Sequence, residues 1–184
     1  MRKHLTAILA AATLVLVPSA IAFASYTWTG TGVENELWYA AAMSDSGSVA
    51  YSSKNDFSSP YEAHIWKSTN GGETWSELTS SPHKKTWRRI VASGNGSKVA
   101  AIGYGHESYS EYLSLSNNGG TTWASAGDQP REWFDVAMSR DGSVLVATNK
   151  SMSNSDGGVW RSTDGGVNWT DVTPVVSSAK VLGV

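Results

Sequence analysis

Side chains that could bind a ligand are concentrated in five segments of unlike sequence. These are residues 54–63, 80–86, 103–111, 127–132 and 149–157, which carry tyrosines, acids and bases at irregular spacing. Aromatic rings beside carboxylates and cations suit a carbohydrate or a peptide. The alternative is a solvated rim of loops that binds nothing. The ligand-face candidates are Tyr61, Glu62, Tyr104, His106, Glu107, Tyr109, Arg131 and Glu132.

Hydrolysis of a glycosidic bond would require two carboxylates on opposite sides of that bond. Glu107, Glu111, Glu132 and Asp135 are candidates by location, but no spacing singles out a pair. The sequence contains no Ser-His-Asp arrangement, no phosphate-binding glycine loop, no metal-ligand spacing and no cysteine. We therefore expect no metal, no cofactor and no catalysis by this chain alone.

An internal repeat organises these segments. The octets STNGGETW, SNNGGTTW and STDGGVNW end in tryptophans that lie 48 and 46 residues apart. A second motif, which contains Gly47, Gly96 and Gly142, recurs with steps of 49 and 46 residues. Two motifs that share one period indicate a true repeat. The repeats span about 33–79, 80–126 and 127–173.

Each repeat predicts four short strands. In the third copy they cover residues 135–138, 143–148 and 159–162, and the last begins at Trp169. A tight turn such as Asp141-Gly142 joins the first two strands, because both residue types tolerate a positive φ. Four strands in 40 to 50 residues are typical of one β-propeller blade. We predict an all-β propeller of four-stranded antiparallel blades, with about three repeats present as a partial ring or fragment.

The octet itself has the composition of a turn. A Ser and an Asp or Asn two residues later can bond to their own backbone, paired glycines allow positive φ, and the Trp packs on the blade. We therefore expect a structural device rather than a ligand site. Its residues are Ser68, Asn70, Gly72, Trp75, Ser116, Asn118, Gly120, Trp123, Ser162, Asp164, Gly166 and Trp169.

The pattern Ser-x-Asp-x-Gly-x-x-Trp resembles the Asp box, or BNR repeat, of sialidase-like propellers. In that family the box lies on third-to-fourth-strand turns, away from the catalytic face. The family includes sialidases, xyloglucan-type glucanases, sortilin-like receptors and a photosystem assembly factor, so the resemblance does not choose one activity. Arg88 and Arg89 fall on a predicted inner strand, which fits a sialidase. However, the usual Arg-Ile-Pro segment is missing, and Arg89-Ile90-Val91 is the nearest approach.

The first 24 residues have the features of a secretory signal peptide. Arg2 and Lys3 precede an uncharged, mostly apolar run at 5–17, and residues 22–24 have the A-x-A form of a cleavage site. Cleavage would leave residues 25–184 with 12 basic and 16 acidic residues, a net charge of −4. We expect one domain, secreted or in the periplasm or cell envelope. We expect no nucleic-acid partner and no membrane contact after cleavage.

Three repeats do not close a propeller, which typically has four to eight blades. Residues 26–32 resemble a fourth strand and residues 180–184 resemble the start of a first strand. Either the chain is part of a longer propeller or two copies complete one ring, and open strand edges favour self-association. We predict an exported module that binds or scaffolds a carbohydrate or protein ligand. The alternative is a sialidase- or xyloglucanase-like glycoside hydrolase whose other catalytic residues lie beyond Val184.

Overall fold

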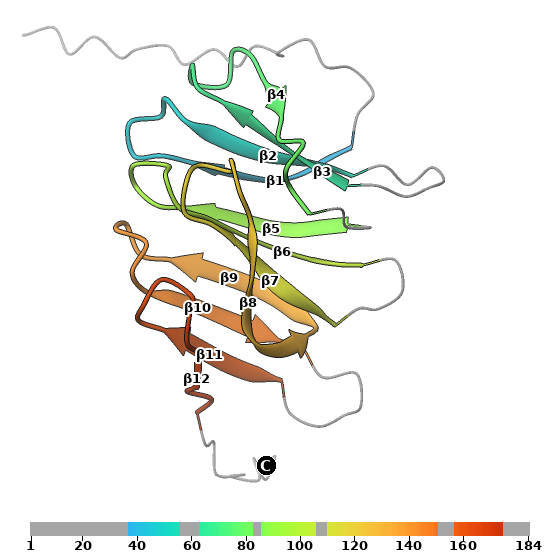
Figure 1. The fold of residues 1–184 in the computed structure, drawn as a ribbon, viewed down its shortest axis with the longest axis vertical. Coiled ribbons are helices and arrows are strands. Elements are labelled where there is room, and N and C mark those ends of the chain that lie inside the picture. Colours follow the sequence, from blue (N-terminus) through green and yellow to red (C-terminus); the bar gives the residue numbers. More distant parts are fainter. Residues whose placement is uncertain (1–36, 56–62, 83–85, 106–109, 151–156, 175–184) are drawn as a thin grey trace, which may run out of the picture. The chain divides into compact units, whose positions relative to one another are not determined.

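The computed structural model describes residues 37–55, 63–82, 86–105, 110–150 and 157–174. These residues form three four-stranded antiparallel sheets, each built from consecutive strands of the chain (Figure 1). The predicted all-β architecture with four strands per repeat is therefore confirmed. In the described part of the chain, no helix is long and apolar enough to cross a membrane.

The strand boundaries follow the sequence repeat. The first sheet contains β1 (Trp38–Met43), β2 (Ala50–Asn55), β3 (Ala63–Ser68) and β4 (Ser76–Glu77). The second contains β5 (Thr86–Ala92), β6 (Val99–Tyr104), β7 (Glu111–Ser116) and β8 (Ala124–Arg131). The third contains β9 (Trp133–Met138), β10 (Leu145–Asn149), β11 (Gly158–Ser162) and β12 (Thr170–Asp171).

Three segments that the sequence assigned a role lie outside the described residues. The signal peptide at 1–24 and the extra strands expected at 26–32 and 180–184 lie outside the described residues, so they stay predictions.

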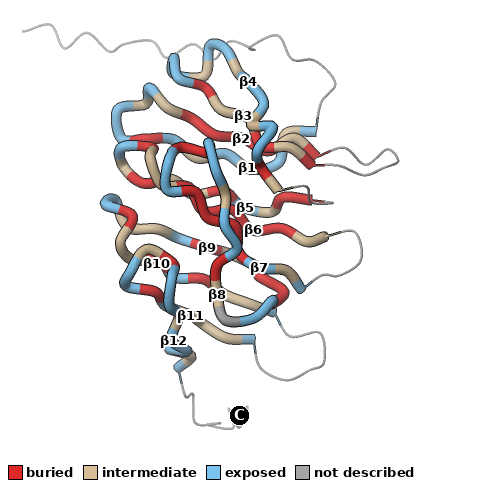
Figure 2. The backbone as a smooth tube through the Cα atoms, in the orientation of Figure 1, coloured by how far each residue is buried: buried red, intermediate tan, exposed pale blue. Residues whose placement is uncertain are grey.

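Two hydrophobic cores hold the three sheets together. Tyr51 and Ile65 of the first sheet pack with Ile90 and Val99 of the second, and a matching cluster joins the second sheet to the third. Strand β6 is buried along almost its whole length because both faces of the middle sheet are covered (Figure 2). It therefore lacks the inside–outside alternation of a half-exposed strand.

A tryptophan near the start of each repeat, the leading tryptophan, is a packing residue. Trp87 and Trp133 are completely buried, and the Trp87 indole N–H donates to the Ala63 carbonyl of the preceding sheet at 3.2 Å. Trp38 is half-buried, with its ring centroid 5.9 Å from that of Trp66. The inner strand of each sheet is thus anchored at its first or second residue.

A β-bulge follows this tryptophan in all three sheets. The pairing register shifts between Trp38 and Ala40, between Trp87 and Arg89, and beside Trp133 in the third sheet. A bulge leaves one residue unpaired and re-aims its side chain. The residues at this position are Tyr39, Arg88 and Phe134.

Each octet forms one hydrogen-bonded turn between the third and fourth strands. The Ser116 hydroxyl donates to Asn118 Oδ1 at 3.0 Å and accepts the Gly120 N–H at 2.8 Å. Asn118 Oδ1 also accepts the Thr122 N–H at 2.9 Å, and the Trp123 indole donates to the Gly120 carbonyl at 3.1 Å. The other two boxes repeat these bonds. The structural role expected for the box fits this geometry.

The first-to-second turns are longer than a two-residue hairpin. The Ser93 N–H donates to the Lys98 carbonyl at 2.9 Å, so four residues lie within the closed turn, and Gly96 takes a φ of 70°. The Ser93 hydroxyl accepts the Lys98 N–H at 3.0 Å and closes the turn from inside. Ser44 and Ser139 act in the same way in the other sheets.

Both kinds of turn lie at the same end of each sheet, which we call the turn face. The first glycine of every box donates its N–H to the first-to-second turn of the same sheet. These bonds are Gly71 to Ser48 at 3.0 Å, Gly119 to Ser97 at 2.7 Å and Gly165 to Ser143 at 2.8 Å.

Replacing Ser116 with Ala should lower the free energy of unfolding by about 1–3 kcal/mol, because the buried Gly120 N–H loses its acceptor. Urea unfolding followed by tryptophan fluorescence measures the change. Asn117→Ala is the matched control, since Asn117 lies exposed in the same turn, and it should change stability by less than about 0.5 kcal/mol. Equal effects of the two substitutions would contradict the role assigned to the box serine.

Candidate functional site

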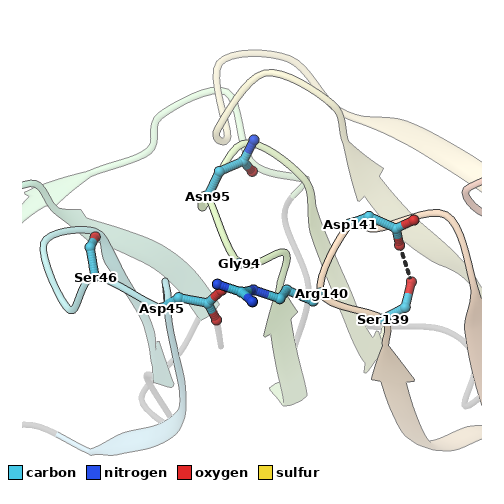
Figure 3. A pocket seen from close by; sticks show the side chains of 7 residues that line it. All are labelled: Asp45, Ser46, Gly94, Asn95, Ser139, Arg140 and Asp141. Atoms are coloured by element: carbon cyan, nitrogen blue, oxygen red, sulfur yellow. Dashed lines mark hydrogen bonds and ion pairs between the residues drawn. The ribbon is translucent and has the colours of Figure 1, made fainter.

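The turn face contains an open pocket of about 1050 Å³, between the first-to-second turns of the three sheets (Figure 3). Figure 3 shows Arg140 directed at Asp45 past Gly94, while Asp141 turns toward Ser139. The lining residues are Asp45, Ser46, Gly94, Asn95, Ser139, Arg140 and Asp141.

The polar groups of this pocket are occupied by one another. Arg140 Nε pairs with the Asp45 carboxylate, and a Cβ at Gly94 would lie only 2.3 Å from that carboxylate. Asp141 accepts the Ser139 hydroxyl and the Ser143 N–H, at 2.5 and 3.0 Å, and these bonds hold its pKa well below the ordinary value. No group of three or more metal-ligating acids or histidines occurs among the described residues. The Arg140–Asp45 ion pair therefore joins the first-to-second turns of the first and third sheets across this pocket.

The opposite ends of the strands carry the residues that the sequence assigned to a ligand. Tyr104, Arg131 and Glu132 lie within the described residues. Tyr61, Glu62, His106, Glu107 and Tyr109 lie outside them, so their placement stays a prediction.

Tyr104 belongs to a cluster centred on Arg88. The Arg88 guanidinium carbon lies 5.4 Å from the ring centroids of both Tyr104 and Phe134, within cation–π range. Its Nη1 atom is buried and has no hydrogen-bond partner in the structure. The Phe134 side of the cluster is open, because that residue is 57% exposed.

Arg131 is the last residue of β8, Glu132 lies between β8 and β9, and both are buried. The Arg131 guanidinium carbon lies 3.7 Å from the Trp160 ring centroid, and Nη1 donates to the Gln129 carbonyl at 3.2 Å. Glu132 has one carboxylate oxygen, Oε2, that is buried without a hydrogen-bond partner in the structure. Arg131 thus packs into the sheet, whereas Glu132 retains a free acceptor.

Asp135, a carboxylate considered for catalysis, is held in an ion pair. Arg89 Nε and Nη2 donate to its two oxygens at 2.7 and 3.2 Å, and the Val136 N–H donates to Oδ1 at 2.8 Å. This bidentate pair links the inner strands of the second and third sheets. Arg89 is consequently engaged within the protein, in contrast to its neighbour Arg88.

Arg88 and Phe134 were not among the ligand-face residues expected from the sequence. Both follow the leading tryptophan of a repeat, and the same offset gives Tyr39 in the first repeat. The residue type changes at this one position of an otherwise regular repeat, and that change could have identified the position as a candidate site. The bulge that re-aims these residues was not visible in the spacing.

Known proteins support the fold of this chain. No protein-family model matches it. A xyloglucanase of Paenibacillus sp. is 24% identical over 139 residues, which covers 62% of this chain and 14% of that protein.

Two solved structures are similar. The GH74 enzyme of Niastella koreensis has a TM-score of 0.55 at 19% identity, over 74% of this chain and 22% of that chain. YCF48 bound to D1 peptide has a TM-score of 0.50 at 17% identity, over 83% of this chain and 43% of that chain. Both are Asp-box β-propeller proteins, and the three sheets resemble part of their rings. The chain thus spans less than half the length of each of these three proteins.

Replacing Asp164 with Asn should reduce the loss of stability in acid. Hydrogen bonds from the Asn168 N–H and side-chain amide and from the Ser162 hydroxyl lower the Asp164 pKa from 3.8 to about 2. Because the folded-state pKa is lower than the unfolded value, Asp164 contributes stability above pH 3.8 that is lost as the pH falls toward 2.

Thermal unfolding between pH 5 and pH 2 tests this prediction. The apparent melting temperature of D164N should fall less steeply below pH 4 than that of the wild type, since Asn does not titrate. Asn70 and Asn118 already occupy the equivalent positions, so the substitution suits the turn. Parallel curves for the two proteins would show that the Asp164 hydrogen bonds do not contribute to acid stability.

Proposed function

We propose that this chain is a noncatalytic binding module of an exported Asp-box propeller, which holds a protein segment at the start of its inner strands. The proposal rests on the Arg88 side chain, which lies between the rings of Tyr104 and Phe134. One of its guanidinium nitrogens has no hydrogen-bond partner in the structure. Two aromatic contacts hold the guanidinium in place, and its buried Nη1 has no acceptor in the structure.

A carboxylate is the acceptor that this arrangement favours. A guanidinium held by stacking loses little side-chain entropy on binding, and its charge-assisted bonds to carboxylates are stronger than those to neutral oxygens. The exposed Phe134 ring offers apolar contact area beside the charge. A peptide that presents a carboxylate next to an apolar side chain matches both features.

The peptide is favoured over a sugar chain by one comparison. YCF48, whose fold resembles 83% of this chain, was solved with a D1 peptide bound. The similarity concerns the fold alone, so the assignment to this chain rests on the Arg88 cluster. An extracytoplasmic location follows from the signal-like first 24 residues and belongs to the same proposal.

Replacing Arg88 with Ala should weaken peptide binding at least tenfold, because the charged donor is lost. The test uses a peptide array in which every sequence is displayed with both a free and an amidated C-terminus. Arg88→Lys should recover only part of the affinity, since an ammonium cannot stack and fork in the same way.

Arg140→Ala is the control, because Arg140 is exposed on the turn face. The proposal requires a preference for carboxylates that disappears in R88A and persists in R140A. Peptide binding that depends neither on the C-terminal group nor on Arg88 would exclude the proposal.

A glycoside hydrolase is the second candidate, supported by the aligned 139 residues of a xyloglucanase and by the free carboxylate oxygen of Glu132. A general acid or base contributes about 10²–10⁴-fold to the rate. The binding proposal predicts no turnover of fluorogenic glycosides or xyloglucan oligosaccharides by the chain. Turnover that Glu132→Gln abolishes while the fold is retained would establish the enzyme instead.

A further inference from the structure

The contact between neighbouring sheets repeats the same hydrogen bond. The Asp45 N–H donates to the Gly94 carbonyl at 2.8 Å, and the Gly94 N–H donates to the Arg140 carbonyl at 2.6 Å. These three residues hold one position in the repeat. Within the described residues, the series leaves a backbone donor at Arg140 and an acceptor at Asp45 without backbone partners. One sheet could therefore be added at either end by the same bond.

A cationic side chain strengthens the contact from the outer part of the sheet. Lys67 Nζ of the first sheet donates to the Gly119 carbonyl in the Asp box of the second at 2.9 Å. Lys67 immediately precedes its box serine, and Arg161 immediately precedes Ser162 in the third sheet. Arg161 is exposed, so it has the position and charge to donate to the corresponding glycine of a following sheet. That glycine is Gly71 in the first box.

The outer face of the third sheet, which points away from the second sheet, corresponds by repeat position to the face of the second sheet that is buried against the third. By strand register, Ala137, Val146 and Val159 occupy the positions that Val91, Ala100 and Leu113 hold in the second sheet. Ala100 and Leu113 are completely buried against the third sheet, whereas Val146 is 36% exposed. The third sheet thus exposes an apolar face of the kind that the second sheet buries.

The outer face of the first sheet is the complementary half. Met43 is 54% exposed and Trp66 is half-buried, at the positions that Met138 and Trp160 occupy in the third sheet. Met138 and Trp160 pack against the second-to-third core. A single chain consequently carries one copy of each half of the contact that already joins its sheets.

We propose that a second copy of this chain docks its first-sheet face on the third-sheet face, with the same face-to-face packing that joins the sheets within one chain. Such a contact is heterologous, and two copies joined at both ends would place six sheets in one ring. Six lies within the range of four to eight blades that propellers use. The contact is between sheet faces and does not require pairing of open strand edges.

Light scattering after size exclusion, over a hundredfold range of concentration of the full chain, tests the proposal. The wild type should have twice the mass of a single chain at high concentration. Val146→Asp should raise the dissociation constant at least tenfold, because it places a carboxylate in the centre of the contact. Val167→Asp is the matched control, since Val167 is 72% exposed on the Asp-box turn, and it should leave the dimer intact.

Mixing two face variants tests the head-to-tail arrangement. V146D retains the first-sheet face, and Met43→Glu retains the third-sheet face. Neither should self-associate, but a mixture should form a one-to-one complex through the remaining intact pair of faces. Arg161→Glu provides an independent variant if V146D does not give a cooperative thermal transition. It should also raise the dissociation constant.

Each result of these experiments either supports or overturns the head-to-tail dimer. Loss of the dimer in V146D and M43E, with recovery on mixing, supports the proposal. A monomer at every concentration would overturn it, as would a dimer that survives both substitutions. A dimer that V146D and M43E abolish without recovery on mixing would also overturn it, because the contact would then join like faces.

Discussion

A buried serine hydroxyl in each Asp box is the interaction on which the three sheets depend. It accepts the N–H of the second box glycine and donates to the Asp or Asn two residues later. With the turn closed, the first glycine can reach the first-to-second turn of the same sheet. Those turns then bond from sheet to sheet. The serine hydroxyl thereby holds the box closed, and the closed box supports the hydrogen bonds that join the turns within each sheet and between neighbouring sheets.

This network determines which face remains available for function. On the turn face, serines, glycines and acids satisfy one another, and even the pocket beside Arg140 is crossed by an ion pair. At the other ends of the inner strands, the bulge frees one residue per sheet from the regular pairing. Arg88 and Phe134 meet there because their strands are adjacent. The structural face is regular, and the variable residues lie away from it.

The fold was largely predictable, and the site only in part. The period of the octet predicted four strands per repeat, and the third sheet follows the expected segments closely. Tyr104 joins a cluster, but Arg131, expected on the ligand face, is buried against Trp160. The stacking of Arg88 on two rings depends on a bulge and on residues 46 positions apart, which no local pattern encodes.

The sequence by itself determined the repeat, the strand order and the turn chemistry, because short-range hydrogen bonds and the alternation of strands depend on neighbouring residues. Tertiary structure alone decided which charges are engaged. Arg88 and Arg89 are adjacent in the chain, yet Arg89 forms a bidentate ion pair with Asp135 while a nitrogen of Arg88 is buried without a hydrogen-bond partner in the structure. The difference arises because the bulge directs consecutive side chains to different surroundings, and the neighbouring sheet supplies a carboxylate to only one of them.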